Sequence, residues 1–292
     1  MESKMENENP GETGVNKIAN VSRALVNVTK VGGDQNARNI DFKIGGEHGW
    51  LRGLGNLLDN ECARWWKTRM WLIHSLIWAS LTVFILYQTP RAFYFEGFEP
   101  IPAWFQTLGV IVIMQGVLVG EKKDGTAAWV MSKPASRPAF ILSKLIGNSL
   151  GMLATMVGLS GVIAYIFFSN APRGAPDPIS FLTALGIIIL SHLFYLTLTL
   201  MLGTLFKGYG PVIGVNLGLL LFSQMLINRI PELRHILPMP LLFSIFNSQD
   251  SALLTALNGQ SLDLYIPLIM IVGVECILFI LISLWRFSRE EF

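Results

Sequence analysis

Residues 121–144 read EKKDGTAAWVMSKPASRPAFILSK. This polar, lysine-rich stretch lies between two apolar segments, 101–120 and 140–168, and each segment is long enough to cross about 30 Å of hydrocarbon as a helix. The stretch is therefore expected at a membrane face. Its cluster of basic residues assigns that face to the cytoplasm by the positive-inside rule.

Glycine and proline divide this loop into pieces. Gly125 can break the incoming helix, Thr126 can cap a new one, and prolines at positions 134 and 138 can end it. Trp129 offers an aromatic anchor on that short segment. We expect a short cytoplasmic helix that lies across the ends of two membrane helices.

Composition assigns the class independently of the loop. Of the 292 residues, 52% are hydrophobic and only 14% are charged, which is typical of a polytopic membrane protein. The net charge of +2 is small and the basic residues follow the membrane sides, so no nucleic acid partner is expected. The expected fold is an all-α integral membrane domain over residues 49–292.

Six apolar segments predict six membrane-spanning helices, at about 70–87, 101–120, 140–168, 179–206, 211–230 and 265–285. Both termini then lie in the cytoplasm. Lys and Arg support this orientation, with twelve on the inner side (52, 64, 67, 69, 122, 123, 133, 137, 144, 207, 286 and 289) and four outside (91, 173, 229 and 234).

Two segments precede the first span. Residues 1–48 are rich in Asn, Gly and charge, which predicts a flexible cytoplasmic extension without a cleavable signal peptide. Residues 50–67 have apolar positions at helical spacing, which predicts an amphipathic helix in the inner membrane interface. Basic residues at its end can reach lipid phosphate: Arg64, Lys67 and Arg69.

The fifth span carries Gly210, Gly214 and Gly218, a spacing that lets two helix backbones approach closely in lipid. Gln224 and Asn228 fall on roughly the same face. This stripe is open to three interpretations: a contact between two permease halves, a wall of a substrate path, or packing within the chain. Gly147 and Gly151 form a second, shorter pattern.

Two ionisable residues are predicted near the bilayer centre. Glu275 in the sixth span and His192 in the fourth should lie at similar depth, so we expect them to form a polar contact on a substrate path. A neutral Glu275 bonded to a backbone carbonyl or a hydroxyl is the alternative. Between the last two spans, residues 229–264 predict short re-entrant helices.

The loop resembles that of the six-span permease subunits of type-2 ABC exporters. The residues that carry the resemblance are Glu121, Gly125, Thr126, Ser132, Pro134, Ser136, Arg137, Phe140 and Lys144. The resemblance implies a coupling helix that docks on a separate ATPase subunit. The residues implied in coupling are Glu121, Asp124, Gly125, Thr126, Trp129, Ser132, Lys133, Pro134 and Arg137.

Enzyme chemistry is not expected in this chain, because it has no phosphate loop of the G-x-x-x-x-G-K-[ST] kind and no paired cysteine metal motif. The resemblance places ATP and Mg²⁺ on two partner ATPase subunits and adds a second permease copy or homologous half, in the plasma (inner) membrane. The chain itself is expected to hold no cofactor. An ATP-independent transporter or channel and a non-transporting scaffold or sensor are the alternatives, and the substrate stays open.

Overall fold

The computed structural model describes residues 49–244 and 250–290, and every regular element in these ranges is helical. Six helical segments are long and apolar enough to cross a membrane: Met70–Gln88, Arg91–Lys123, Arg137–Ser169, Pro178–Leu205, Tyr209–Arg229 and Ile266–Ser288. The predicted all-α integral membrane fold with six spans is confirmed. The extension predicted at 1–48 lies outside the described residues.

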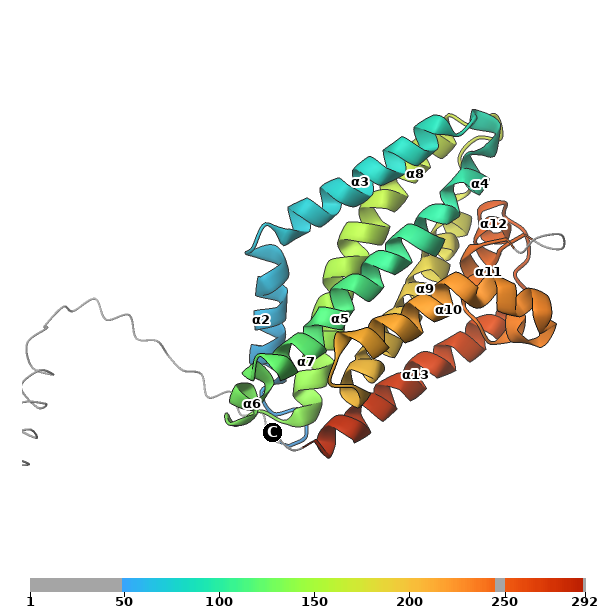
Figure 1. The fold of residues 1–292 in the computed structure, drawn as a ribbon. Coiled ribbons are helices and arrows are strands. Elements are labelled where there is room, and N and C mark those ends of the chain that lie inside the picture. Colours follow the sequence, from blue (N-terminus) through green and yellow to red (C-terminus); the bar gives the residue numbers. More distant parts are fainter. Residues whose placement is uncertain (1–48, 245–249, 291–292) are drawn as a thin grey trace, which may run out of the picture. The chain divides into compact units, whose positions relative to one another are not determined.

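Helix α9 (Pro178–Leu205) is the central element of the bundle (Figure 1). It packs against α5 (Thr107–Lys123), α10 (Tyr209–Arg229) and α13 (Ile266–Ser288). Its apolar side chains point in all directions, as in a helix that is surrounded by others. By contrast, α3 (Met70–Gln88) lies at the edge of the bundle and packs mainly on α8 (Leu159–Ser169).

The second and third spans each contain a segment of π-helix. The second comprises η1 (Arg91–Phe93), α4 (Tyr94–Phe98), the π-helical η2 (Ile101–Gln106) and α5; the third comprises α7 (Arg137–Met152), the π-helical η3 (Leu153–Gly158) and α8. The side chain of Gln106 donates to the carbonyl of Met156 at 2.9 Å, so one π segment is tied to the other. The helical segment that contains the predicted second span begins before Ile101, at Arg91, because the helical path accommodates the nearby prolines through this irregular turn.

Helix α2 (Leu54–Trp66) packs along α7. Glu61 covers Gly147 and Trp65 covers Gly151 so closely that a Cβ atom at either glycine would overlap these side chains. The shorter of the two glycine patterns is therefore the one that allows a close helix contact within the chain.

Three short elements lie at the end of the bundle opposite α6 (Thr126–Met131): η4 (Pro231–His235), α11 (Met239–Leu242) and α12 (Ala252–Leu257) (Figure 1). α11 and α12 pack on α9. The buried carboxylate of Glu99 accepts hydrogen bonds from Ser244 and from Ser251, the N-cap of α12, and so attaches Ser244 and the start of α12 to the second span. Burial raises the pKa of the Tyr265 hydroxyl, which donates to the Asp250 carbonyl nearby.

We predict that Gly151→Ala destabilises the protein. Gly-to-Ala inside a helix normally stabilises by up to about 1 kcal/mol, whereas overpacking costs about 1–3 kcal/mol, and here the new Cβ would overlap the Trp65 ring. Thermal unfolding in detergent measures the difference. Gly186→Ala is the matched control, because a Cβ at this α9 glycine meets no atom within 4 Å. Equal or higher stability of Gly151→Ala would show that α2 does not pack closely here.

Candidate functional site

The short helix α6 begins directly after Gly125, whose φ of 71° places it in the left-handed region that favours glycine. Thr126 does not cap this helix, contrary to the prediction; its hydroxyl donates back to the carbonyl of Glu121 at 3.2 Å. α6 ends at Met131, before Pro134, and Pro138 lies in the first turn of α7, so it begins the next helix and does not end this one. Ser136 caps α7 by accepting from the backbone N–H of Ala139 at 3.2 Å.

One side of α6 packs on the bundle and the other is open. Ala127 is fully buried, whereas the Trp129 side chain is 61% exposed. The Lys133 ammonium lies 3.4 Å from the centre of the Trp129 ring, and the Ser132 hydroxyl donates to the Trp129 carbonyl at 2.7 Å. An exposed aromatic ring held by a cation and surrounded by polar groups is typical of a protein contact surface.

The last turn of α5, just before α6, is fixed by a buried lysine. Lys144 on α7 makes ion pairs with Glu61 on α2 and with Glu121 on α5, and the side chain of Lys144 is only 6% exposed. Asn148, one turn along α7, accepts from the Trp65 indole N–H at 3.1 Å and donates to the Lys144 carbonyl at 2.8 Å. This cluster joins three helices through groups that are unfavourable to bury unless they are paired.

The next residue, Lys122, faces the other side of the bundle. Its ammonium lies 2.7 Å from the Glu290 carboxylate and donates to the carbonyls of Gly203 and Thr204, at 3.1 and 3.2 Å. These carbonyls belong to the last turn of α9, where the helix itself supplies no donor and where a cation is favourable. Arg137 donates to the Ser288 carbonyl at the end of α13, and the Phe140 and Phe287 rings stack nearby at 5.3 Å.

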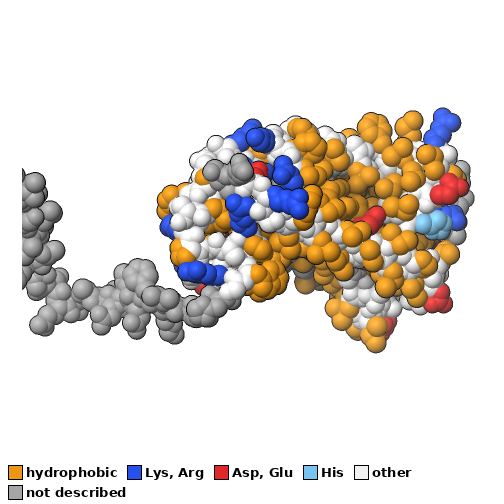
Figure 2. Space-filling model, turned by 90° about the horizontal axis from the view of Figure 1, so that it is seen from below, with side chains coloured by type: hydrophobic (Ala, Val, Ile, Leu, Met, Phe, Trp, Pro, Cys, Tyr) orange, Lys and Arg blue, Asp and Glu red, His pale blue; other side chains and the backbone are white. Residues whose placement is uncertain are grey.

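Exposed cations surround the end of the bundle that these ion pairs connect. Figure 2 shows Lys and Arg side chains gathered at one end of the described residues, next to broad hydrophobic surface. The exposed basic residues beside α6 and the ends of α9 and α13 include Lys123, Lys133, Lys207 and Arg289. Asp124 is also exposed, directly before α6. The site therefore combines a rigid charged interior with an open, mostly basic face.

The glycine stripe of α10 does not pack within the chain. A Cβ at Gly210, Gly214 or Gly218 would meet no atom within 4 Å, so the interpretation as intrachain packing is wrong for the described residues. The stripe continues into exposed apolar side chains, among them Leu221, Phe222 and Met225. Gln224 is half-buried and Asn228 is exposed further along α10.

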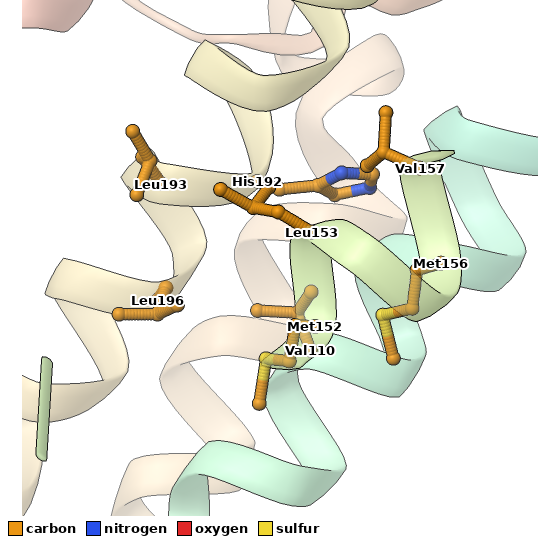
Figure 3. A pocket seen from close by; sticks show the side chains of 8 residues that line it. All are labelled: Val110, Met152, Leu153, Met156, Val157, His192, Leu193 and Leu196. Carbon is orange, nitrogen blue, oxygen red and sulfur yellow. The ribbon is translucent and has the colours of Figure 1, made fainter. Parts of the chain in front are cut away.

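The predicted contact between His192 and Glu275 is absent from the described residues. His192 lies in a hollow that α5, α7, η3 and α9 line (Figure 3), and its Nε2 is 3.2 Å from the carbonyl of Pro102. This carbonyl belongs to the π-helical η2, where the irregular turn leaves backbone groups to be paired by side chains. Glu275 is on α13, half-buried, and one carboxylate oxygen has no hydrogen-bond partner.

No group of three or more His, Cys, Asp or Glu side chains with the geometry of a metal site occurs in residues 49–244 and 250–290. Two of the ion-paired residues, Glu61 and Lys122, escaped the sequence analysis. Glu61 was not singled out there, and Lys122 was counted only as a basic residue of the inner side. The spacing of 23 residues between Glu121 and Lys144 contains no signal of their contact.

The chain is similar to known membrane transporter sequences. The family profile described as "ABC-2 family transporter protein" matches residues 8–292. A relative in Bacillus subtilis (strain 168), the uncharacterized transmembrane protein YxlG, is 26% identical over 194 residues, which cover 64% of this chain and 70% of the relative.

We predict that Lys144→Met destabilises the bundle, because it leaves the carboxylates of Glu61 and Glu121 without their buried cation. Breaking a buried ion pair from one side costs about 3–5 kcal/mol, which corresponds to a fall of about 6 °C or more in Tm for a chain of this size. Thermal unfolding in detergent measures the change.

The triple variant Lys144→Met with Glu61→Gln and Glu121→Gln is the control, since it removes the unpaired charges together with the lysine. It should regain much of the lost stability. A single variant as stable as the wild type would refute the structural role of the cluster.

Proposed function

Because the chain belongs to the ABC-2 family of transporter proteins, we propose that it is the permease subunit of an ATP-driven exporter, completed by a second permease half and two ATPase subunits. The chain is a multi-pass membrane protein. The proposed membrane is the plasma (inner) membrane, with both termini and α6 in the cytoplasm. ATP and Mg²⁺ would bind to the ATPase subunits.

The observation that carries this proposal is the position of α6. This helix has an open face with Trp129, yet it follows a turn whose two adjacent residues, Glu121 and Lys122, are paired on opposite sides of the bundle. A push on α6 would therefore reach α2 and α7 through one residue, and α9 and α13 through the other. Closure of the ATPase pair around ATP would supply that push.

The proposed substrate path lies between two permease halves. α10 supports this choice, because its glycine stripe leaves room for a second backbone that residues 49–244 and 250–290 do not supply. The neighbouring polar residues Gln224 and Asn228 are the candidates to line the path, with Glu275 as a further candidate on α13; His192 is buried inside the bundle and does not face this path. Movement of the two halves along this contact would carry substrate outward.

The assignment is tested by identifying the proteins that bind to the chain. A tagged chain, extracted from its own cells in mild detergent, is expected to co-purify with a nucleotide-binding ATPase that mass spectrometry identifies. Recovery of the chain with no such subunit, in an otherwise intact and folded sample, would contradict the proposal.

We predict that Trp129→Ala lowers recovery of the ATPase by about tenfold or more, because exposed tryptophans at the centre of contacts carry about 2 kcal/mol or more. Gly125→Val should act in the same direction, since a β-branched residue is strained at a φ of 71°. The measurements are co-purification and substrate-stimulated ATP hydrolysis. Tyr87→Ala is the control, an exposed aromatic at the far end of α3, and it should behave as the wild type. Normal coupling in both α6 variants would exclude α6 as the docking helix.

We predict that Gly214→Leu reduces transport, because a large side chain would separate backbones that meet at the α10 stripe. Single cysteines at position 214 should crosslink two copies of the chain, or the chain to its homologous half. Gly186→Leu is the control, since this α9 glycine also faces open space but lies outside the stripe. An active Gly214→Leu protein together with absent crosslinks would place the contact elsewhere.

A further inference from the structure

A hollow lies where α2 ends and α3 begins, at the end of α2 that lies away from α6. Water-sized spheres can occupy about 50 Å³ of it, and it is partly open to the exterior. Four helices contribute to its wall: Arg64 and Trp65 from α2, Met70 and His74 from α3, Ile113 from α5 and Asn148 from α7. The α2 and α3 residues form one side, and the bundle forms the other.

The polar side chains that line the hollow have N–H donors that their contacts within the described residues do not use. The Arg64 side chain is 50% exposed and reaches the carboxylates of Glu61 and Glu121 only loosely, at 3.8 and 4.0 Å. A guanidinium has five N–H donors, which is more than these two contacts use. The His74 ring lies 5.2 Å from the Trp65 ring and is tilted by 42° against it, and no hydrogen bond of the His74 ring nitrogens occurs in the described part of the chain.

The charge around the mouth favours an anion. Inside the cluster, Glu61 and Glu121 are matched by Lys144 and Arg64. The exposed Lys67 and Arg69 lie in the link between α2 and α3. No acidic residue occurs between Arg64 and the end of α3 at Gln88. The mouth of the hollow is therefore positive overall.

The other side of the hollow is apolar and continues into the exposed apolar surface of α3. Met70 is 45% exposed, and the next turns of α3 present Leu72, Ile73, Leu76 and Ile77 to the exterior. Only 17% of the apolar 18-residue stretch of α3 is buried within the described residues. The Trp66 and Trp71 rings lie 6.1 Å apart beside the hollow, and tryptophan is a residue type that is enriched at membrane–water boundaries. An occupant would thus meet cations at one end and a lipid-facing surface at the other.

We propose that this hollow binds a phospholipid with an anionic headgroup. The phosphate would accept hydrogen bonds from Arg64 and His74, and an acyl chain would leave between Met70 and Ile113 along the open face of α3. A soluble phosphate compound offers the same anion, but it gains nothing from the apolar half of the site. The proposal concerns lipid alone and stands independently of coupling to an ATPase.

The site also touches the buried cluster. Arg64 is the one member of that cluster that reaches solvent from α2, so a phosphate bound there would draw it from Glu121 towards the lipid. Because the lipid binds the folded protein, anionic lipid is expected to raise the thermal stability of the purified protein as well as to bind.

The test uses the full chain in nanodiscs of mixed phosphatidylglycerol and phosphatidylcholine. Native mass spectrometry counts the lipids that stay bound, and thermal unfolding reports stabilisation. Wild-type protein should retain phosphatidylglycerol preferentially. Arg64→Gln should weaken this retention about tenfold, which corresponds to about 1.4 kcal/mol, and Ile113→Phe should weaken it by filling the hollow with the charges intact.

Arg52→Gln is the matched control, an exposed arginine just before the same helix that does not line the hollow, and it should retain lipid as the wild type does. Arg64→Lys, which keeps the charge but not the planar donors, should show intermediate retention and guards against a folding defect in Arg64→Gln. Unchanged retention in folded Arg64→Gln and Ile113→Phe would overturn the proposal. Equal stabilisation by soluble glycerol phosphate and by the lipid would assign the site to a soluble anion and refute the lipid.

Discussion

The ion pairs of Lys144 with Glu61 and Glu121 are the interaction on which the α6 end of the protein depends. A charged group inside a helix bundle is unfavourable unless an opposite charge and hydrogen bonds compensate it. Here each of the three groups comes from a different helix, so α2, α5 and α7 hold one another in place. Sliding of any one of them would leave a buried charge unpaired. The cluster therefore favours movement of this end as one body.

The residue next to Glu121 makes a similar connection on the other side of the bundle. Lys122 pairs with Glu290 and donates to the last carbonyls of α9, so the turn before α6 is attached to the central helix as well. Further from this end, the contacts are mostly apolar, and two spans pass through π-helical turns whose backbone groups bond to side chains of other helices. A firmly paired end beside irregular middle segments would suit the proposed coupling through α6.

Two glycine patterns with the same spacing have different roles in this fold. Gly147 and Gly151 are covered by side chains of α2, whereas the stripe from Gly210 to Gly218 is bare. The spacing indicates that a backbone can be approached closely; it does not indicate which element approaches. The edge position of α3 and the open face of α10 likewise mark surfaces that lipid or another chain must cover, since apolar side chains there face outward.

The sequence by itself determined the membrane class, the six spans, the break at Gly125 and the short helix after it, because hydrophobic length and backbone preference are local properties of the chain. It missed the helical segment that precedes Ile101 in the second span, since the π-helical turn there is paired with side chains of other helices, such as His192. It also paired His192 with Glu275 from depth alone, although depth does not fix the direction in which a side chain points. The cluster around Lys144 was decided only by the tertiary structure, because buried charges choose their partners through helix packing over separations that no local pattern encodes.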